Sequence, residues 1–354
     1  MGDTQNIRIV DIAKMAGVSI GTVDRVLHNR GRVSEENRKK IEAILTQVNY
    51  KPNMMARSLV SKRIYHLAVI IPQFVTGEYW AQISSGIDHA LTDFRQYHIE
   101  AEKFYFDQFD EYSLRKLLDN INLDKVDGVL VAPLFAAAVL DFSKVLDDRN
   151  IPYVFIDTDV EQGKRMAFIG TSAIAGGRIV AKLLSKNIKV NDDILMARIA
   201  HSGVESAQAQ SRRHGFLEYL KEYEFQGNTY EVDLYLKDAK QNKQIMDDIL
   251  SLHKNIKAIV IFNSKAYIPG NYLEEKGRKD ICLVGYDLVE QNERLLQNGT
   301  IEALLAQHPY LQGYEGIRLL YNKLIFEKDP GEIIGFPLEI LVKENYIFYK
   351  TYKF

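Results

Sequence analysis

From residue 66 onward, the sequence alternates short apolar runs with amphipathic segments of helical periodicity. The apolar runs are rich in β-branched side chains and cover residues 67–71, 128–131, 153–156, 194–196, 258–261 and 281–284. Near-continuous apolar strands between helices are typical of a parallel sheet that helices cover on both faces. Because these strands are too many for one compact sheet, we expect two doubly wound subdomains, with ligands bound outside the carboxyl ends of the strands.

The first 63 residues differ from this body in charge. They carry 12 Lys and Arg side chains against 6 Asp and Glu, whereas the rest of the chain carries 33 against 41. A basic head on an acidic body is the electrostatic pattern of a nucleic-acid-binding module attached to a separate domain. We therefore predict an all-α head over residues 1–63 and an α/β body over residues 64–354.

Three short helices are predicted in the head. The first covers Ile9 to Ala16 and ends at a glycine, which readily adopts positive φ. The second covers Ile20 to Leu27 after the N-cap Ser19, and the third runs from the N-cap Ser34 to about Val48. The small, turn-forming and branched residues of a helix-turn-helix fall at Ala13, Gly17 and Val23. This spacing predicts a DNA-binding head.

Longer motifs extend this match. Residues 18–27 (VSIGTVDRVL), 33–38 (VSEENR), 49–53 (NYKPN) and 56–59 (ARSL) closely resemble the lactose-repressor (LacI) family of bacterial regulators, in both order and gaps. The resemblance implies a sequence-specific DNA-binding transcription regulator, in most relatives a repressor. A homodimer or a higher oligomer is expected, because two helix-turn-helix heads that read a pseudopalindromic operator require two-fold symmetry.

The resemblance also implies roles for individual residues of the head. Base edges in the major groove would be read at Ile20, Gly21 and Arg25, and Arg25 could bond a guanine through O6 and N7. The positions that match phosphate contacts are Ser19, Thr22, Ser34, Asn37 and Tyr50, while Arg32 could touch either bases or phosphates. Asp24, Gly21, Arg8 and His28 depart from the family pattern, so the operator sequence does not follow from the resemblance.

A hinge helix is expected at about residues 53–60. Asn53 and Ala56 match DNA-contacting positions of the family's hinge. Leu59 matches a leucine that wedges between base pairs in the minor groove and kinks the duplex. A linker or core leucine is the alternative interpretation of Leu59.

The body resembles, more loosely, the periplasmic-type sugar-binding fold that LacI-family regulators share. The landmarks are residues 77–80, 151–157, 212–216, 285–287 and 306–314. The fold implies an N-subdomain of about residues 64–168 and 307–332, and a C-subdomain of about residues 169–306 and 333–354. A small-molecule effector, a sugar or a similar metabolite, is expected to bind between them.

Candidate effector-binding residues follow from what a sugar presents, which is hydroxyls and apolar C–H faces. Asp157 and Asp287 would accept hydroxyl protons, Arg212 would donate, and Asn263 and Gln307 could do both. Tyr79 and Trp80 could stack on a sugar face. The alternatives are that Trp80 is a core residue and that Arg213 is the donor in place of Arg212. The two aspartates could instead be caps or salt-bridge partners, and Asn263 could be a helix cap.

Two stretches lack the Asp or Asn residues that sugar-binding relatives carry. Residues 134–138 (LFAAA) follow the strand that ends at Ala132 and Pro133, and residues 171–173 (TSA) follow Gly170. A deoxy, acylated or otherwise less hydroxylated effector is therefore conceivable.

The sequence predicts neither a cofactor nor a metal site, because it lacks the dinucleotide, phosphate-loop, nucleophile-elbow and zinc motifs. We expect a regulator that is not an enzyme. A carbohydrate-binding enzyme and an exported transport receptor remain the alternatives. The polar N-terminus and the absence of a long apolar run predict a soluble cytoplasmic protein, and the lone Cys282 fits a reducing compartment.

Overall fold

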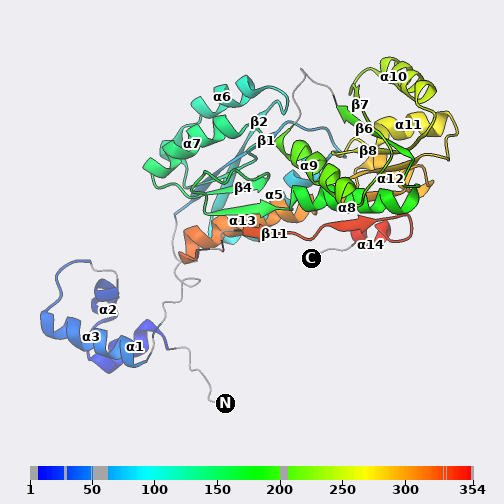
Figure 1. Ribbon diagram of the computed structural model, residues 1–354. Helices are drawn as coiled ribbons and strands as arrows, with labels where there is room; N and C mark the ends of the chain where they lie inside the picture. The colour runs from blue at the N-terminus through cyan, green and yellow to red at the C-terminus, as the bar shows by residue number, and fades with distance from the viewer. Residues whose placement is uncertain are drawn as a thin grey trace, which may run out of the picture. The chain divides into compact units, whose positions relative to one another are not determined.

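The computed structural model describes residues 7–27, 30–48, 50, 63–199, 206–329, 331 and 333–351. The chain divides into two compact units, Met1–Lys62 and Arg63–Phe354 (Figure 1). The division falls one residue before the limit predicted between head and body. The predicted hinge helix, with Asn53, Ala56 and Leu59, lies outside the described residues.

In its described part, the head forms α1 (Ile9–Ala16), α2 (Ile20–Leu27) and α3 (Glu35–Gln47). These bounds confirm the predicted helices. Each helix contributes a fully buried side chain to a small core, and these are Ile12, Val23 and Ile41. The opposite face of α2 is turned to solvent, so the head buries one stripe of each helix and leaves the other free for a partner.

Local caps set the helix bounds in the head. Gly17 has φ of 68° after α1, and Ser34 Oγ accepts a hydrogen bond of 3.4 Å from the Asn37 backbone N–H. Arg8 stands at the N-cap of α1, where a hydroxyl side chain is more common. The Asp11 carboxylate compensates, because it accepts a 3.0 Å hydrogen bond from the Arg8 backbone N–H.

The first sheet of the body runs in the order β11-β5-β4-β3-β1-β2, and all its neighbouring strands are parallel. Its strands are β1 (Tyr65–Pro72), β2 (Ile99–Phe106), β3 (Gly128–Val131), β4 (Tyr153–Asp157), β5 (Ala167–Gly170) and β11 (Ile333–Gly335). Its helices are α5 (Tyr79–Asp93), α6 (Glu111–Asp119), α7 (Ala136–Asp148) and α13 (Pro309–Phe326), with short 3-10 turns at Arg95–Tyr97 and Leu123–Lys125.

The second sheet repeats this topology in the order β12-β10-β9-β8-β6-β7, with β12 alone antiparallel to its neighbour among the described strands. Its strands are β6 (Asp193–Ile199), β7 (Thr229–Leu234), β8 (Ile256–Ile261), β9 (Cys282–Tyr286), β10 (Ala303–Ala306) and β12 (Glu339–Leu341). Its helices are α8 (Ala173–Asn187), α9 (Ala207–Glu222), α10 (Ala239–Leu252), α11 (Tyr267–Glu275) and α12 (Glu290–Gln297), and α14 (Tyr346–Thr351) follows β12.

Helices cover both faces of each sheet (Figure 1). In β1, Leu67 and Val69 pack against α5 and α13, whereas Ala68 and Ile70 pack against α6 and α7. Successive side chains of a strand point to opposite faces. Because both faces are buried here, the central strands are almost continuously apolar. The two sheets and their helices confirm the predicted fold class of two doubly wound parallel-sheet subdomains.

The chain crosses between the two sheets after β5, β10 and β11. β5 ends at Gly170 and β11 at Gly335, and these two strands pair with each other in the first sheet. The N-subdomain therefore extends beyond the predicted limits of residues 168 and 332. The short β11 pairs with a strand far away in sequence, so its own residues give little indication of the sheet to which it belongs.

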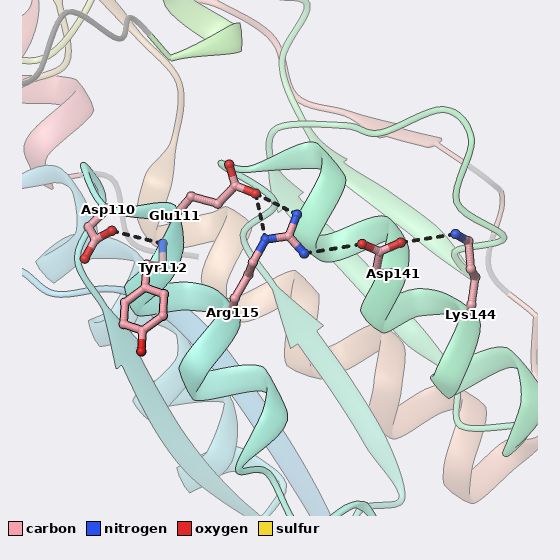
Figure 2. Close-up of polar contacts among 6 residues, drawn as sticks. All are labelled: Asp110, Glu111, Tyr112, Arg115, Asp141 and Lys144. Atoms are coloured by element: carbon pink, nitrogen blue, oxygen red, sulfur yellow. Dashed lines mark hydrogen bonds and ion pairs between the residues drawn. The ribbon is translucent and has the colours of Figure 1, made fainter.

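A chain of charged side chains ties α6 to α7 on the surface (Figure 2). Arg115 Nη2 lies 2.7 Å from Glu111 Oε1, and its Nη1 donates to Asp141 Oδ2 at 3.3 Å. Lys144 extends the chain with a 3.2 Å hydrogen bond to Asp141 Oδ1. All four side chains are well exposed, so water screens the pairs and each contributes little to stability.

Among the described helices, none has the length and apolar character that crossing a lipid bilayer requires.

Candidate functional site

Loops from both sheets line a cavity of about 180 Å³ in the body. The cavity lies at the carboxyl ends of the central strands of both sheets, where ligands of parallel sheets bind. The structure brings together all seven residues that the sequence suggests for effector binding, which are Tyr79, Trp80, Asp157, Arg212, Asn263, Asp287 and Gln307.

Asp157 and Asp287 occupy equivalent positions in the two subdomains. Asp157 is the last residue of β4 and Asp287 directly follows β9, and both strands are third in the order of their sheets. Both residues have positive φ, 70° for Asp157 and 61° for Asp287. This left-handed conformation is strained for a non-glycine residue and is often found at binding sites. The repeated fold thus places one carboxylate on each side of the cavity.

The Asp157 carboxylate is buried at 5% exposure and accepts hydrogen bonds from three side chains. The Tyr79 hydroxyl donates to Oδ1 at 2.5 Å, Gln208 Nε2 donates to Oδ1 at 3.3 Å, and Thr158 Oγ1 donates to Oδ2 at 3.2 Å. Burial raises the pKa of Asp157, while the Tyr79 hydrogen bond opposes that rise. Burial and the Asp157 charge raise the pKa of Tyr79 well above its usual value, so Tyr79 stays a donor.

Gln307 links Asp287 to Arg212. Its Nε2 donates to both oxygens of the Asp287 carboxylate, at 3.1 and 2.9 Å. Its Oε1 accepts hydrogen bonds from Arg212 Nη2 at 2.5 Å and from Thr171 Oγ1 at 3.2 Å. This pattern fixes the orientation of the amide, because the oxygen meets two donors and the nitrogen meets a carboxylate. Gln307 is therefore held by protein groups and positions its neighbours.

Arg212 is a buried cation at 3% exposure on α9. Its Nη1 donates to the Phe262 carbonyl oxygen at 2.8 Å, and its guanidinium carbon lies 4.2 Å from the centre of the Tyr286 ring. The neighbouring Arg213 instead donates to Glu231 Oε1 on β7, at 2.9 Å, and does not line the cavity. The structure thus favours Arg212 over Arg213 as a donor in the cavity.

Burial raises the pKa of Asp287 to about 7, although Arg212 and the Gln307 hydrogen bonds act in the opposite direction. The carboxyl of Asp287 therefore titrates near neutral pH, beside the buried Arg212 guanidinium. A ligand that donates hydroxyl hydrogen bonds would favour the ionised form of this carboxyl.

Trp80 and Asn263 each combine a structural role with a place in the cavity wall. Trp80 is 7% exposed, belongs to the apolar core, and meets the Tyr79 ring edge to face at 5.4 Å. Asn263 Oδ1 accepts a 2.9 Å hydrogen bond from the Lys265 backbone N–H, so it caps a turn before α11. The amide nitrogen of Asn263 is not used in that turn and can serve a ligand.

Direct contacts between the two subdomains surround the cavity, and no feature of the sequence indicates them. Lys265 Nζ, after β8, lies 2.5 Å from Glu78 Oε1, at the start of α5, and both side chains are largely buried. Gln208 Nε2 donates to the Asp157 carbonyl oxygen at 3.0 Å, and Gln82 Nε2 donates to the Leu288 carbonyl oxygen at 3.0 Å. We refer to the Glu78–Lys265 ion pair as the rim latch.

The head presents its candidate DNA-contacting residues on the outer side of α2 and beside α3. Ile20 is 52% exposed although it is apolar. Also exposed are Ser19, Gly21, Arg25, Arg32 and Ser34, while Thr22, Asn37 and Tyr50 are half-buried. Ser19 Oγ accepts from the Thr22 backbone N–H at 3.2 Å, so it caps α2 as predicted.

Two family models match the chain. That of the bacterial regulatory proteins, lacI family, matches residues 8–53, which include α1, α2 and α3. That of a periplasmic binding protein domain matches residues 67–328, which include most strands of both sheets and the cavity.

Similar proteins match over most of the chain. The ribose operon repressor of Bacillus subtilis (strain 168) is 27% identical over 329 residues, which are 91% of this chain and 92% of the repressor. The ribose operon repressor of Lactococcus lactis subsp. lactis (strain IL1403) is 23% identical over 346 residues, which are 95% of this chain and 97% of that protein. A solved structure from Bacteroides fragilis, assigned as a LacI transcriptional regulator, is 33% identical with a TM-score of 0.77, and the match covers 81% of this chain and 100% of that one.

Proposed function

The chain belongs to the lacI family of bacterial regulatory proteins, and we propose that the cavity between its two sheets binds a small sugar that controls the affinity of the head for operator DNA. Membership of this family makes the chain a DNA-binding transcription regulator and not an enzyme. The proposal concerns the finer points, which are the effector, the residues that bind it and the way in which binding reaches the DNA.

The observation that carries the proposal is the convergence of polar groups from both subdomains on one small cavity. Asp157 comes from the first sheet, and Arg212 and Asp287 come from the second. A ligand that bonds all three can do so only while the subdomains are close together. Binding therefore favours the closed arrangement, as ligand does in other hinge-closing proteins.

A sugar fits the chemistry of these groups. Carboxylates accept hydroxyl protons, the guanidinium donates, and the aromatic rings of Tyr79 and Trp80 can cover C–H faces. A cavity of about 180 Å³ suits a monosaccharide better than an oligosaccharide. The relatives named as ribose operon repressors support an effector of this class.

For the DNA, we propose that α2 enters the major groove with Ile20, Gly21 and Arg25 at base edges. The phosphate contacts would come from Ser19, Thr22, Ser34, Asn37 and Tyr50, with Arg32 at either, and the hinge contacts from Asn53, Ala56 and Leu59. A homodimer would place two heads on a pseudopalindromic operator, in the cytoplasm where the DNA is. Cavity closure in each protomer would then change the spacing of the heads.

The effector site can be tested with an isosteric substitution. We expect Asp157→Asn to weaken sugar binding at least tenfold in calorimetric titration, because the ionised acceptor is lost. Asp141→Asn is the matched control, since Asp141 lies on the surface of the same subdomain, in the ion-pair chain of Figure 2. Equal affinities of the Asp157→Asn variant and the wild-type protein would contradict the proposed site.

The DNA surface can be tested on an operator obtained by in vitro selection. We expect Arg25→Ala to reduce the discrimination between the operator and its single-base variants by about 1–3 kcal/mol at one position. Asn37→Ala, at a phosphate-contacting position, should weaken binding to all sequences alike. An Arg25→Ala protein with unchanged base preference would contradict the assignment of α2 as the reading helix.

A further inference from the structure

We propose that the effector is a monosaccharide with an apolar end, of the deoxy-sugar class, and that this end lies against the first subdomain. The inference rests on the proposed function and names the ligand class of the same cavity. It comes from a group of large apolar side chains on the first subdomain and from polar groups with remaining hydrogen-bonding capacity on the second.

The first subdomain presents an apolar wall. Trp80 comes from the first turn of α5, Phe109 from the loop after β2, and Leu134 and Phe135 from the loop after β3. Phe135 packs against the core of the subdomain. The centre of its ring lies 6.4 Å from that of the buried Phe106 ring, in an edge-to-face arrangement. We refer to these four residues as the apolar wall.

The polar groups of the same subdomain are largely engaged by the protein. Asp157 already accepts hydrogen bonds from Tyr79, Thr158 and Gln208, and a carboxylate accepts about four in all. Glu78 is paired with Lys265 in the rim latch. The half-buried Gln108 amide, beside Phe109, can meet a hydroxyl at the margin of the wall.

The second subdomain supplies polar groups that keep hydrogen-bonding capacity, beside apolar residues such as Ile199 and Phe262. Asp287 accepts two hydrogen bonds from the single donor group of Gln307 and so keeps acceptor capacity on both oxygens. Arg212 uses two terminal nitrogens on protein acceptors and has further N–H groups. The Asn263 amide nitrogen is not engaged in its turn. Hydroxyls of a ligand therefore find partners on this side.

A fully hydroxylated sugar would fit this division poorly. A hydroxyl placed against the apolar wall gives up its hydrogen bonds to water without replacement, which is unfavourable. A methyl group in the same place gains by leaving water. A hydrophobic pocket discriminates between such close analogues by about 10- to 100-fold.

The test uses sugars that differ by one hydroxyl at the terminal carbon. Calorimetric titration of the full-length protein compares L-fucose with L-galactose, L-rhamnose with L-mannose, 6-deoxy-D-glucose with D-glucose, and 5-deoxy-D-ribose with D-ribose. One of the four pairs will contain the sugar with the highest affinity. In that pair, we expect the deoxy sugar to bind at least tenfold more tightly than its hydroxylated partner. If the hydroxylated member binds equally or more tightly, the inference is wrong and the proposed function stands. If no sugar binds, both are wrong.

A substitution in the apolar wall provides a second readout. We expect Leu134→Asn to reduce the affinity ratio within that pair severalfold, because an amide gives the extra hydroxyl a partner. Leu134→Met, which keeps the wall apolar, should preserve the ratio. A ratio measured within one variant does not depend on how much of the preparation is folded. An unchanged ratio in Leu134→Asn would overturn the placement of the apolar end at Leu134.

Discussion

At the residue scale, the buried carboxyl of Asp287 makes the stability of the protein depend on pH. Burial raises its pKa from 3.8 to about 7. A carboxyl whose pKa is higher in the folded than in the unfolded state binds its proton more tightly when folded. Its contribution to stability is therefore full below pH 3.8 and is lost as the pH rises through about 7.

This sign gives a prediction for Asp287→Asn, which keeps the shape of the side chain and cannot ionise. Between pH 5 and pH 8, the free energy of unfolding of the wild-type protein should fall by about 3 kcal/mol relative to that of the variant. Urea unfolding of both proteins at the two pH values measures the difference. A difference that does not change with pH, or that changes in the other direction, would show that Asp287 is ionised without penalty.

Much of the cavity could be predicted from residues alone. Asp157 and Asp287 follow apolar strands, and the carboxyl ends of parallel strands form the ligand-binding edge of a sheet. The sequence does not predict which of the polar side chains in the cavity already form hydrogen bonds with other protein groups. Gln307 lines the cavity, where the sequence predicts a ligand contact, and its amide also bonds Arg212, Thr171 and Asp287. Such pairing depends on side chains that meet only in three dimensions.

At the element scale, the crossing of α8 and α9 positions Arg212. A methyl group added at Gly177 would lie 1.8 Å from the Arg212 carbonyl oxygen, so the helices would have to separate. At the adjacent Gly176, the added methyl would lie 3.3 Å from the Tyr286 hydroxyl, a contact that small shifts relieve. The close approach of the two helices therefore depends on Gly177.

We expect Gly177→Ala to lower the free energy of unfolding by about 1–3 kcal/mol through overpacking, and to weaken effector binding because Arg212 is displaced. Gly176→Ala is the matched control, and it should be nearly neutral because alanine favours the helix by about 1 kcal/mol over glycine. Chemical unfolding of both variants measures the two effects. Equal stabilities would show that the helix crossing tolerates a side chain at Gly177.

Elements with local signals were the most predictable. The bounds of α1, α2 and α3 follow from caps such as Gly17 and Ser34, which act within a few residues. The edge strands β2 and β7 were not singled out in the sequence. Exposed charged residues such as Glu100 and Glu231 alternate with more buried ones along these strands. They therefore lack the continuous apolar run of the central strands.

At the scale of the whole molecule, the rim latch links the subdomains directly. Lys265 and Glu78 approach each other only when the two sheets are close together. In the proposed opening of the cavity, the two side chains would separate and meet water. The rim latch would therefore favour the closed arrangement, and both of its residues also line the cavity.

We expect Lys265→Gln to raise the dissociation constant of the effector about 5- to 30-fold, because an unpaired, largely buried Glu78 costs about 1–2 kcal/mol on closure. Lys243→Gln is the control, since Lys243 pairs with Glu275 on the exposed surface of a single subdomain. Calorimetric titration with the tightest-binding sugar measures both variants. Equal affinity of Lys265→Gln and the wild-type protein would mean that the latch does not take part in closure.

The most direct test of the whole account is reciprocal coupling between the two ligands of the regulator. The dissociation constant of the sugar is measured with and without saturating operator, and that of the operator with and without saturating sugar. The account predicts that both constants change by the same factor, about fivefold or more, because each ligand favours one arrangement of the same protein. Binding of both ligands with no change in either constant would contradict it.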